Sequence, residues 1–142
     1  MMKKLIVLFT LFCALTLPAF SADISEADKQ NFRSIVTSQL NAFKSDNSAA
    51  AYSFAAPKVT QIFPNAEIFM TMVQHGYPPV YRNEKFSFGS TTTDQFGRPV
   101  QHVTIRTGDG KAYEALYAME LEPDGTWKIA GCTLTEIAET GA

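Results

Sequence analysis

The hydrophobic positions change their period near the middle of the chain. From Ser25 to Asp46 the apolar residues recur at steps of three and four, which is the spacing of one face of an α-helix. Ser25 is a residue type that caps helices. Two short helical segments are predicted over 47–57 and 57–63, and a longer helix follows the capping residue Asn65. The first half of the chain is therefore predicted to be helical.

Strand-like runs fill the second half, over 84–90, 99–107, 111–122 and 126–134. The segments between them, TDQFGR, GDG and EPDG, are typical of turns. Because strands joined by short turns pair antiparallel, we expect a four-stranded meander. The fold class predicted from this order is α+β, with N-terminal helices packed on a curved antiparallel sheet.

Alternation along the longest strand run predicts which side chains face the helices. The apolar set is Tyr113, Ala115, Tyr117, Met119 and Leu121, whereas Glu114 and Glu120 fall on the opposite face. The same rule turns Phe86, Phe88, Val103, Ile105, Trp127 and Ile129 inward and His102 outward. A β-bulge reverses such an assignment beyond it, and Gly89 and Gly131 are the residues that could mark one.

The N-terminus has the pattern of a cleaved secretory signal. Two lysines precede an apolar run over 5–17, and small residues follow, which predicts cleavage after Ser21. The run is too short for the roughly 20 residues that cross a bilayer. We therefore expect a periplasmic or secreted protein, with no membrane segment in the mature form and a single domain over 22–142 whose compact core spans about 25–134.

Charge and cysteine content narrow the classes of partner. Loss of residues 1–21 removes two lysines and no acid, so the net charge moves from −2 to −4. Mild acidity argues against nucleic acid as a partner.

Cys132 is the cysteine that remains, and its apolar surroundings predict a buried, inert thiol. His75 and His102 form no metal-ligand spacing with it, so neither a metal nor another cofactor is predicted.

The stretch QHGYPPVYR, residues 74–82, combines a helix stop with possible ligand contacts. Gly76 suits a helix end, and the two prolines that follow predict a stiff, extended link into the sheet. This structural explanation does not account for Tyr77, Tyr81 and Arg82. Tyrosines suit a pocket rim and half-buried packing equally, so both interpretations stay open.

Three segments, AFKSDNSAAAYSFAAP (42–57), FMTMVQHGYPPVYR (69–82) and DGTWKIAGCTL (124–134), resemble the bacterial family known as domain of unknown function 4864. That family is similar to the nuclear transport factor 2 and ketosteroid isomerase group of cone-shaped, cystatin-like folds. The resemblance implies helices packed into a curved sheet that encloses a pocket, and it implies no established activity. Where we would expect a proline after Arg82, this chain has Asn83.

An isomerase-like reaction needs a tuned carboxylate inside the cavity and a tyrosine as oxyanion partner. The inward-facing strand positions hold tyrosines but no Asp or Glu, which argues against catalysis, and no catalytic residue is predicted. Asp46 or Glu67 could still reach a pocket mouth from the helices.

The first hypothesis is thus an exported, non-catalytic module that binds a small apolar or aromatic molecule. Its predicted ligand contacts are Tyr77, Tyr81, Arg82, Tyr113, Tyr117, Met119 and Trp127. A cavity of at least ~300 Å³ lined by the inward tyrosines would support it.

Each of the two other hypotheses predicts a structural feature of its own. A protein-interaction or dimerisation domain that uses the outer sheet face, for example as a homodimer, would show an exposed apolar patch on Leu116 and Ala118. An isomerase-like or hydrolase-like enzyme would show a buried carboxylate within hydrogen-bond reach of a tyrosine hydroxyl.

Overall fold

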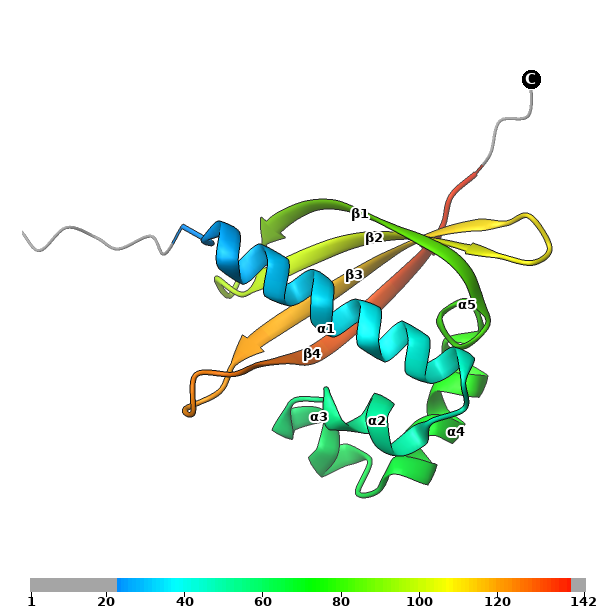
Figure 1. Cartoon of the computed structure of the whole chain (residues 1–142), viewed down its shortest axis with the longest axis horizontal. Helices are drawn as coiled ribbons and strands as arrows, with labels where there is room; N and C mark the ends of the chain where they lie inside the picture. Colours follow the sequence, from blue (N-terminus) through cyan, green and yellow to red (C-terminus); the bar gives the residue numbers. More distant parts are fainter. Residues whose placement is uncertain (1–22, 139–142) are drawn as a thin grey trace, which may run out of the picture.

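The computed structural model describes residues 23–138, which form five helices followed by four strands (Figure 1). The helices are α1 (Glu26–Lys44), α2 (Ser48–Ser53), α3 (Pro57–Ile62), α4 (Ala66–Gly76) and α5 (Pro78–Tyr81). The strands are β1 (Asn83–Thr93), β2 (Pro99–Thr107), β3 (Ala112–Leu121) and β4 (Trp127–Glu136). The predicted signal segment lies outside the described residues. None of the helices within 23–138 is long and apolar enough to cross a membrane.

The four strands form one open antiparallel sheet in the order β1-β2-β3-β4. This confirms the predicted α+β class and the four-stranded meander. The hairpin turns contain Gly97, Gly110 and Gly125, all with positive φ, a conformation that glycine adopts without steric cost. β4 extends two residues beyond the predicted run, to Glu136.

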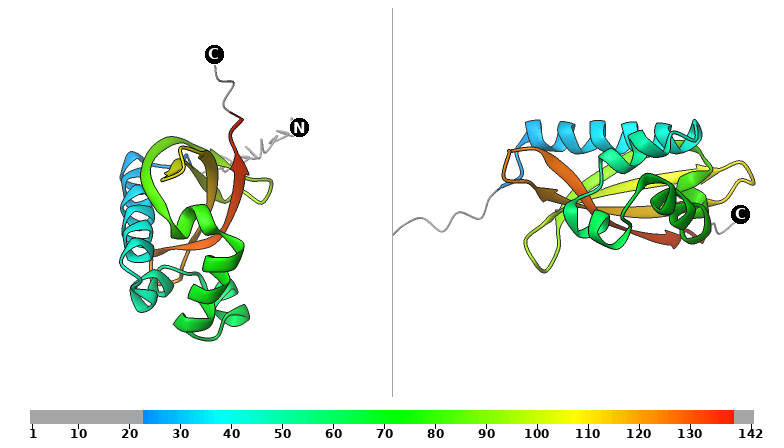
Figure 2. Two further views of the ribbon diagram at one scale, coloured as in Figure 1. Left: turned by 90° about the vertical axis from the view of Figure 1, so that its right-hand side faces the viewer. Right: turned by 90° about the horizontal axis from the view of Figure 1, so that it is seen from below.

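Helix α1 begins where its capping residue predicts. Ser25 Oγ accepts a hydrogen bond from the Asp28 backbone N–H at 3.0 Å, which satisfies one of the free donors of the first turn. The stripe that starts at Phe32 and ends at Phe43 is buried, and the opposite face meets solvent. Figure 1 shows α1 crossing the sheet, and the turned views of Figure 2 show it covering one side.

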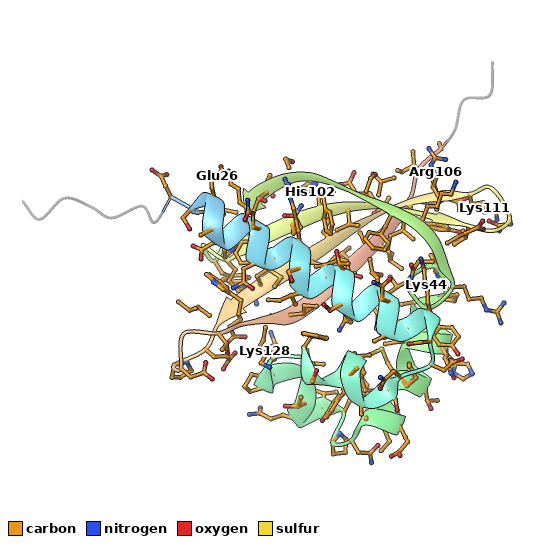
Figure 3. All side chains as sticks on the ribbon, in the orientation of Figure 1. Glu26, Lys44, His102, Arg106, Lys111 and Lys128 are labelled. Carbon is orange, nitrogen blue, oxygen red and sulfur yellow. The ribbon has the colours of Figure 1, made fainter. Side chains whose placement is uncertain are left out.

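The remaining helices gather at one end of the molecule, beside β4 and the end of α1 (Figures 1 and 2). Asn65 Oδ1 caps α4 by accepting from the Ile68 N–H at 2.9 Å. Two lysines tie the sheet to the helices, since Lys128 Nζ donates to Ser53 O at 2.6 Å and Lys44 Nζ donates to Glu84 O at 3.0 Å (Figure 3).

The link between α4 and β1 is helical, so the predicted extended conformation was wrong. Pro78 and Pro79 occupy the first two positions of the four-residue helix α5, where a missing N–H and a φ near −65° are compatible with a helix. Asn83 follows and is 4% exposed. Its Nδ2 donates to Leu40 O at 3.1 Å and to Val80 O at 2.7 Å, which binds α5 to α1.

The inward-facing side of β3 is largely as predicted. Ala115, Tyr117 and Met119 are buried, whereas Leu121 is 55% exposed although it pairs with Trp127, which packs on α1. Leu121 is the last residue of β3 and adjoins the turn into β4, where the strand has left the core. Phe86 and Phe88 pack partly buried against the core, as predicted.

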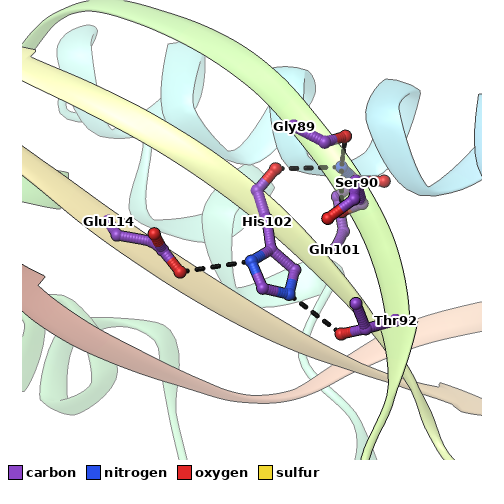
Figure 4. A network of polar contacts seen from close by, with 6 residues as sticks. All are labelled: Gly89, Ser90, Thr92, Gln101, His102 and Glu114. Atoms are coloured by element: carbon purple, nitrogen blue, oxygen red, sulfur yellow. Dashed lines mark hydrogen bonds and ion pairs between the residues drawn. The ribbon is translucent and has the colours of Figure 1, made fainter.

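The strand register shifts at Gly89 and next to Gly131, the two glycines that the sequence marked. In β1 the register shifts between Phe88 and Thr91, where Gly89 and Ser90 form the irregularity. The buried Gln101 side chain stabilises this point, because its Nε2 donates to the carbonyls of Gly89 at 3.1 Å and His102 at 2.9 Å (Figure 4).

The shift next to Gly131 lies between Ala118 and Met119, where β4 carries one extra residue. Tyr117 therefore pairs with Cys132, while Met119 pairs with Ile129. The extra residue exchanges the faces of β4, so Cys132 lies on the inner side of the sheet.

Candidate functional site

An apolar cavity of about 230 Å³ lies between the small helices and the bulged part of β4. We call it the apolar cavity. Its walls are formed by Gln39, Phe43, Ala55, Val59, Phe63, Phe69, Met72, Val73, Tyr77, Val80, Tyr117, Ile129, Ala130, Gly131 and Cys132. Almost all of the lining surface is carbon, and none of these side chains is charged.

The segment between α2 and α3 is fixed to the free edge of β4. The Ala56 N–H donates to Ile129 O at 2.9 Å, and the Ile129 N–H donates to Phe54 O at 2.8 Å. Ala55 forms an isolated parallel bridge with Ile129. These bonds hold Ala55 and the start of α3 against the cavity.

Tyr52 and the α4 stripe complete the helical wall. The Tyr52 hydroxyl donates to Phe63 O at 2.5 Å, which fixes the chain between α3 and α4. The Tyr52 ring also packs on Phe69 with centroids 5.5 Å apart. Phe69 and Val73 are buried on α4 because their spacing of four residues places them on one helix face.

Gln39 brings an amide to the wall of the cavity from α1. Its side chain is 4% exposed, and its Nε2 donates to Ala51 O at 3.1 Å. This bond joins α1 to α2, so the amide has a structural function in addition to its place in the wall.

Three titratable residues line the cavity, Tyr77, Tyr117 and Cys132. Burial raises the pKa of the Cys132 thiol to about 12. Burial, followed by the charge that Cys132 would carry as a thiolate, also raises the pKa values of Tyr77 and Tyr117. All three groups therefore remain neutral at ordinary pH.

The Tyr117 hydroxyl is buried and has no hydrogen-bond partner of normal geometry within residues 23–138. Tyr117 is 1% exposed. Its neighbour is the Cys132 thiol, a weak hydrogen-bonding group whose side-chain contact with the hydroxyl contributes to the raised pKa of Tyr117. The phenol oxygen is therefore closed off from the space of the cavity, next to the Cys132 thiol.

The structure brings two of the seven predicted ligand contacts, Tyr77 and Tyr117, to the apolar cavity. Met119 is buried in the main core, and it does not line this cavity. Trp127 packs edge-on against Phe32, with centroids 4.8 Å apart, and its Nε1 donates to Asp28 Oδ1 at 3.3 Å.

Two further predicted contacts lie in a separate, open polar cleft of about 610 Å³. It is lined by Pro78, Pro79, Arg82, Asn83, Glu84, Thr107, Gly108, Asp109 and Tyr113. Arg82 and Tyr113 are therefore together, but apart from Tyr77 and Tyr117. The GYPPVYR stretch separates the two spaces, because Tyr77 and Val80 line one and both prolines line the other.

Tyr81 meets a carboxylate, but at the surface. Its hydroxyl donates to Asp46 Oδ1, and this bond is the main reason that the Tyr81 pKa is raised. Asp46 is exposed, and neither residue lines the apolar cavity. A tyrosine–carboxylate pair of the kind that isomerase-like chemistry needs therefore exists, but without burial.

The outer sheet face carries a polar network across three strands (Figure 4). His102 Nδ1 lies 3.1 Å from Glu114 Oε1, and His102 Nε2 lies 2.9 Å from Thr92 Oγ1. The order hydroxyl, imidazole and carboxylate is that of a hydrolase triad. However, neither the apolar cavity nor the polar cleft includes these residues, so we interpret them as a cross-strand ladder.

On the outer face of the described sheet, the apolar residues predicted to form a patch are only partly exposed. Leu116 and Ala118 are half-buried and lie in the same row as Glu114 and Glu120. Within the described part of the chain, no group of three His, Cys, Asp or Glu side chains is arranged to hold a metal ion.

Sequence reasoning missed most of the cavity wall. Phe63, Phe69, Met72 and Val73 showed only helical apolar spacing, which indicates core packing and does not distinguish it from the wall of a cavity. The usable signal was the glycine in IAGCTL, which marked the bulge beside the cavity.

We expect Cys132 to resist alkylation while the protein is folded. With a pKa of about 12 the thiolate is scarce at pH 8, so iodoacetamide should label the 22–142 chain at least about a hundredfold more slowly than in urea. Because the pKa of Cys132 is higher in the folded than in the unfolded chain, the free energy of unfolding should fall as the pH rises above about 8.5. Mass spectrometry of timed samples measures the labelling, and equal rates with and without urea would contradict the buried thiol.

Comparison with known proteins places the chain in one family and gives no further match. The model of a family described as "Domain of unknown function (DUF4864)" matches residues 25–142. No curated protein and no solved structure matches the chain.

Proposed function

Because the chain belongs to the DUF4864 family, whose description names no activity, we propose a function from the geometry: the domain binds a small apolar molecule in the apolar cavity. The observation that carries this proposal is a carbon-lined space beside the sheet, bordered by two tyrosines and free of charged side chains.

The size of the cavity supports a small ligand. Its volume of about 230 Å³ is below the roughly 300–1,000 Å³ of sites for drug-sized molecules. An apolar cavity of about 150 Å³ is nevertheless sufficient to bind benzene. We therefore propose a ligand of about one aromatic ring or a similar aliphatic body.

The composition of the wall supports binding without catalysis. No Asp, Glu, His, Lys or Arg is present among the described lining residues, and the thiol is protonated. General acid–base chemistry needs such a group within hydrogen-bond reach of the substrate. The relation to the nuclear transport factor 2 group, the export of the domain and the homodimer through the sheet remain predictions.

Toluene tests the proposal in a thermal unfolding experiment on the 22–142 chain. A ligand that binds only the folded state stabilises it in proportion to its occupancy, and at ten times its dissociation constant the gain is about 1.4 kcal/mol. For a domain of this size we expect the melting temperature to rise by roughly 2–6 °C.

Apolar compounds of the size of cyclohexanol or smaller should also raise the melting temperature. Anthracene derivatives, which are larger than the cavity, should leave it unchanged. A melting temperature that toluene leaves unchanged up to its solubility limit would contradict the proposal. A concentration-dependent rise that saturates would support it.

A further inference from the structure

The last part of β4 is an open edge of the sheet. β4 is the outermost strand on its side, and in the described sheet it pairs with β3 alone. The 54–56 segment takes up this edge at Ile129. From Cys132 to Glu136, no backbone hydrogen bond joins another segment within residues 23–138 to the edge. In the left view of Figure 2 this end of β4 runs along the margin of the molecule, beyond α4.

The hydrogen-bond ladder shows which backbone groups of this edge point outward. Residues of an antiparallel pair alternate between those that bond to the neighbouring strand and those that point away from it. Ile137 bonds toward β3, since its N–H donates to Ala112 O at 2.9 Å. Because the register from there is regular, Glu136, Leu134 and Cys132 point away from β3. Their N–H and C=O groups form a row that is free to pair with a further strand.

This edge lacks the features that keep sheet edges from pairing. Natural edge strands avoid association by means of lysines, prolines or bulges. The opposite edge, β1, has two of these features, because it carries Lys85 and the register shift at Gly89. The segment 132–136, CTLTE, contains no lysine, arginine or proline, and its pairing with β3 is regular. The end of β4 is therefore the less protected of the two edges.

We propose that two copies of the chain pair antiparallel through these edges of β4, about a two-fold axis at Leu134. The outward-pointing residues are symmetric about Leu134, so Leu134 meets its own copy and Cys132 meets Glu136 of the second copy. Each of them turns its N–H and C=O toward the other strand, as a hydrogen-bonded pair requires. Both copies use the same surface, which closes the assembly at a dimer. The interface lies at the strand edge and not on the outer sheet face.

The side chains that this register brings together are compatible. Thr133 and Thr135 are exposed and fall opposite each other across the two-fold axis, and threonine pairs are favourable between strands. Leu134 is half-buried in the single chain and would contact its own copy. Ile137 is 37% exposed and falls opposite Gly131, where a side chain would meet open space.

Two double variants test the register through charge. Thr133→Lys with Thr135→Lys places like charges opposite each other at both symmetric positions, whereas Thr133→Glu with Thr135→Lys places opposite charges there. Both variants carry the same change at 135, and both sites are exposed, so each single chain should melt close to the wild type. Sedimentation equilibrium of the 22–142 chain, from about 10 µM to about 1 mM, measures the dissociation constant of the dimer.

We expect the wild type to dimerise within this range of concentration. The variant with two lysines should dimerise at least about fivefold more weakly, because like charges directly opposite each other destabilise a strand pair. The variant with glutamate and lysine should dimerise at least as tightly as the wild type. A two-fold axis at 133 or 135 would instead place one of these residues opposite its own copy, so it would bring like charges together in both variants.

Amide exchange measured by NMR locates the interface. The amides of Cys132, Leu134 and Glu136 point away from β3, so they should exchange at least about fivefold more slowly at a concentration where most chains are paired than in the single chain. The amides of Thr133 and Thr135 bond to β3 in both states. Their exchange should not depend on concentration, which makes them the internal control.

Each other outcome overturns the proposal. A wild type that stays a single chain at about 1 mM would exclude the dimer. A dimer whose three outward amides exchange as fast as in the single chain would place the interface elsewhere, for example on the outer sheet face. Slowed amides without a difference between the charge variants would exclude the two-fold axis at Leu134. The toluene response tests the apolar cavity separately, so none of these results decides the proposed function.

Discussion

Replacing Phe32 by alanine is expected to lower the free energy of unfolding by about 3–5 kcal/mol, the usual cost of truncating a buried aromatic side chain. Phe32 is fully buried between α1 and the sheet, and its ring contacts Trp127 edge-on at a centroid distance of 4.8 Å. The substitution would remove both the burial and the aromatic contact. Urea unfolding measured by fluorescence provides the value, since Trp127 is the single tryptophan of the chain.

Phe96→Ala is the matched control. Phe96 is 73% exposed in the β1–β2 turn, where the Arg98 guanidinium lies 5.4 Å from the centre of its ring. Surface changes of this kind usually cost about 0.5 kcal/mol or less. If Phe32→Ala were as mild as this control, α1 would not pack on the sheet as described.

The second large effect is expected for Val73→Phe, which should abolish ligand binding in the apolar cavity. Val73 is 4% exposed and lines the apolar cavity from α4, so a phenylalanine ring at this position would occupy space that a ligand needs. Toluene should then no longer raise the melting temperature. The free variant should remain folded, because overpacking usually costs about 1–3 kcal/mol and this site has room for the added atoms.

Val73→Ala provides the opposite change at the same residue. It enlarges the cavity, so toluene should still raise the melting temperature, although the ligand-free variant melts earlier. A toluene response that survives in Val73→Phe would place the binding site elsewhere. Loss of the response in both variants would show that the effect is a loss of structure instead.

The elements whose patterns are local were predictable from the sequence. The capping residue Ser25 and the stripe from Phe32 to Phe43 defined α1, and three glycine-containing turns separated the strands. The α5 turn was mispredicted, because prolines are excluded from a helix interior but accepted in its first turn, and the sequence does not show which applies.

The candidate site was less predictable, because its walls come from distant segments. Strand alternation placed Tyr117 correctly inward, but it could not show that α4 and the 54–56 segment would close a cavity over it. Alternation also grouped Met119 and Trp127 with Tyr117, although they pack into the core and against α1. The bulge in β4 then brought Cys132 to the inner face, which strict alternation from Ile129 does not predict.

The methionine methyl groups of the 22–142 chain test the central claim most directly. Met70, Met72 and Met119 are the methionines of this segment, and Met72 is the one that lines the apolar cavity. In a toluene titration followed by ¹³C-methyl NMR, the Met72 signal should shift saturably while the buried Met70 and Met119 signals move little. Saturable shifts at Met119 without Met72, or no saturable shift at all, would contradict binding in this cavity.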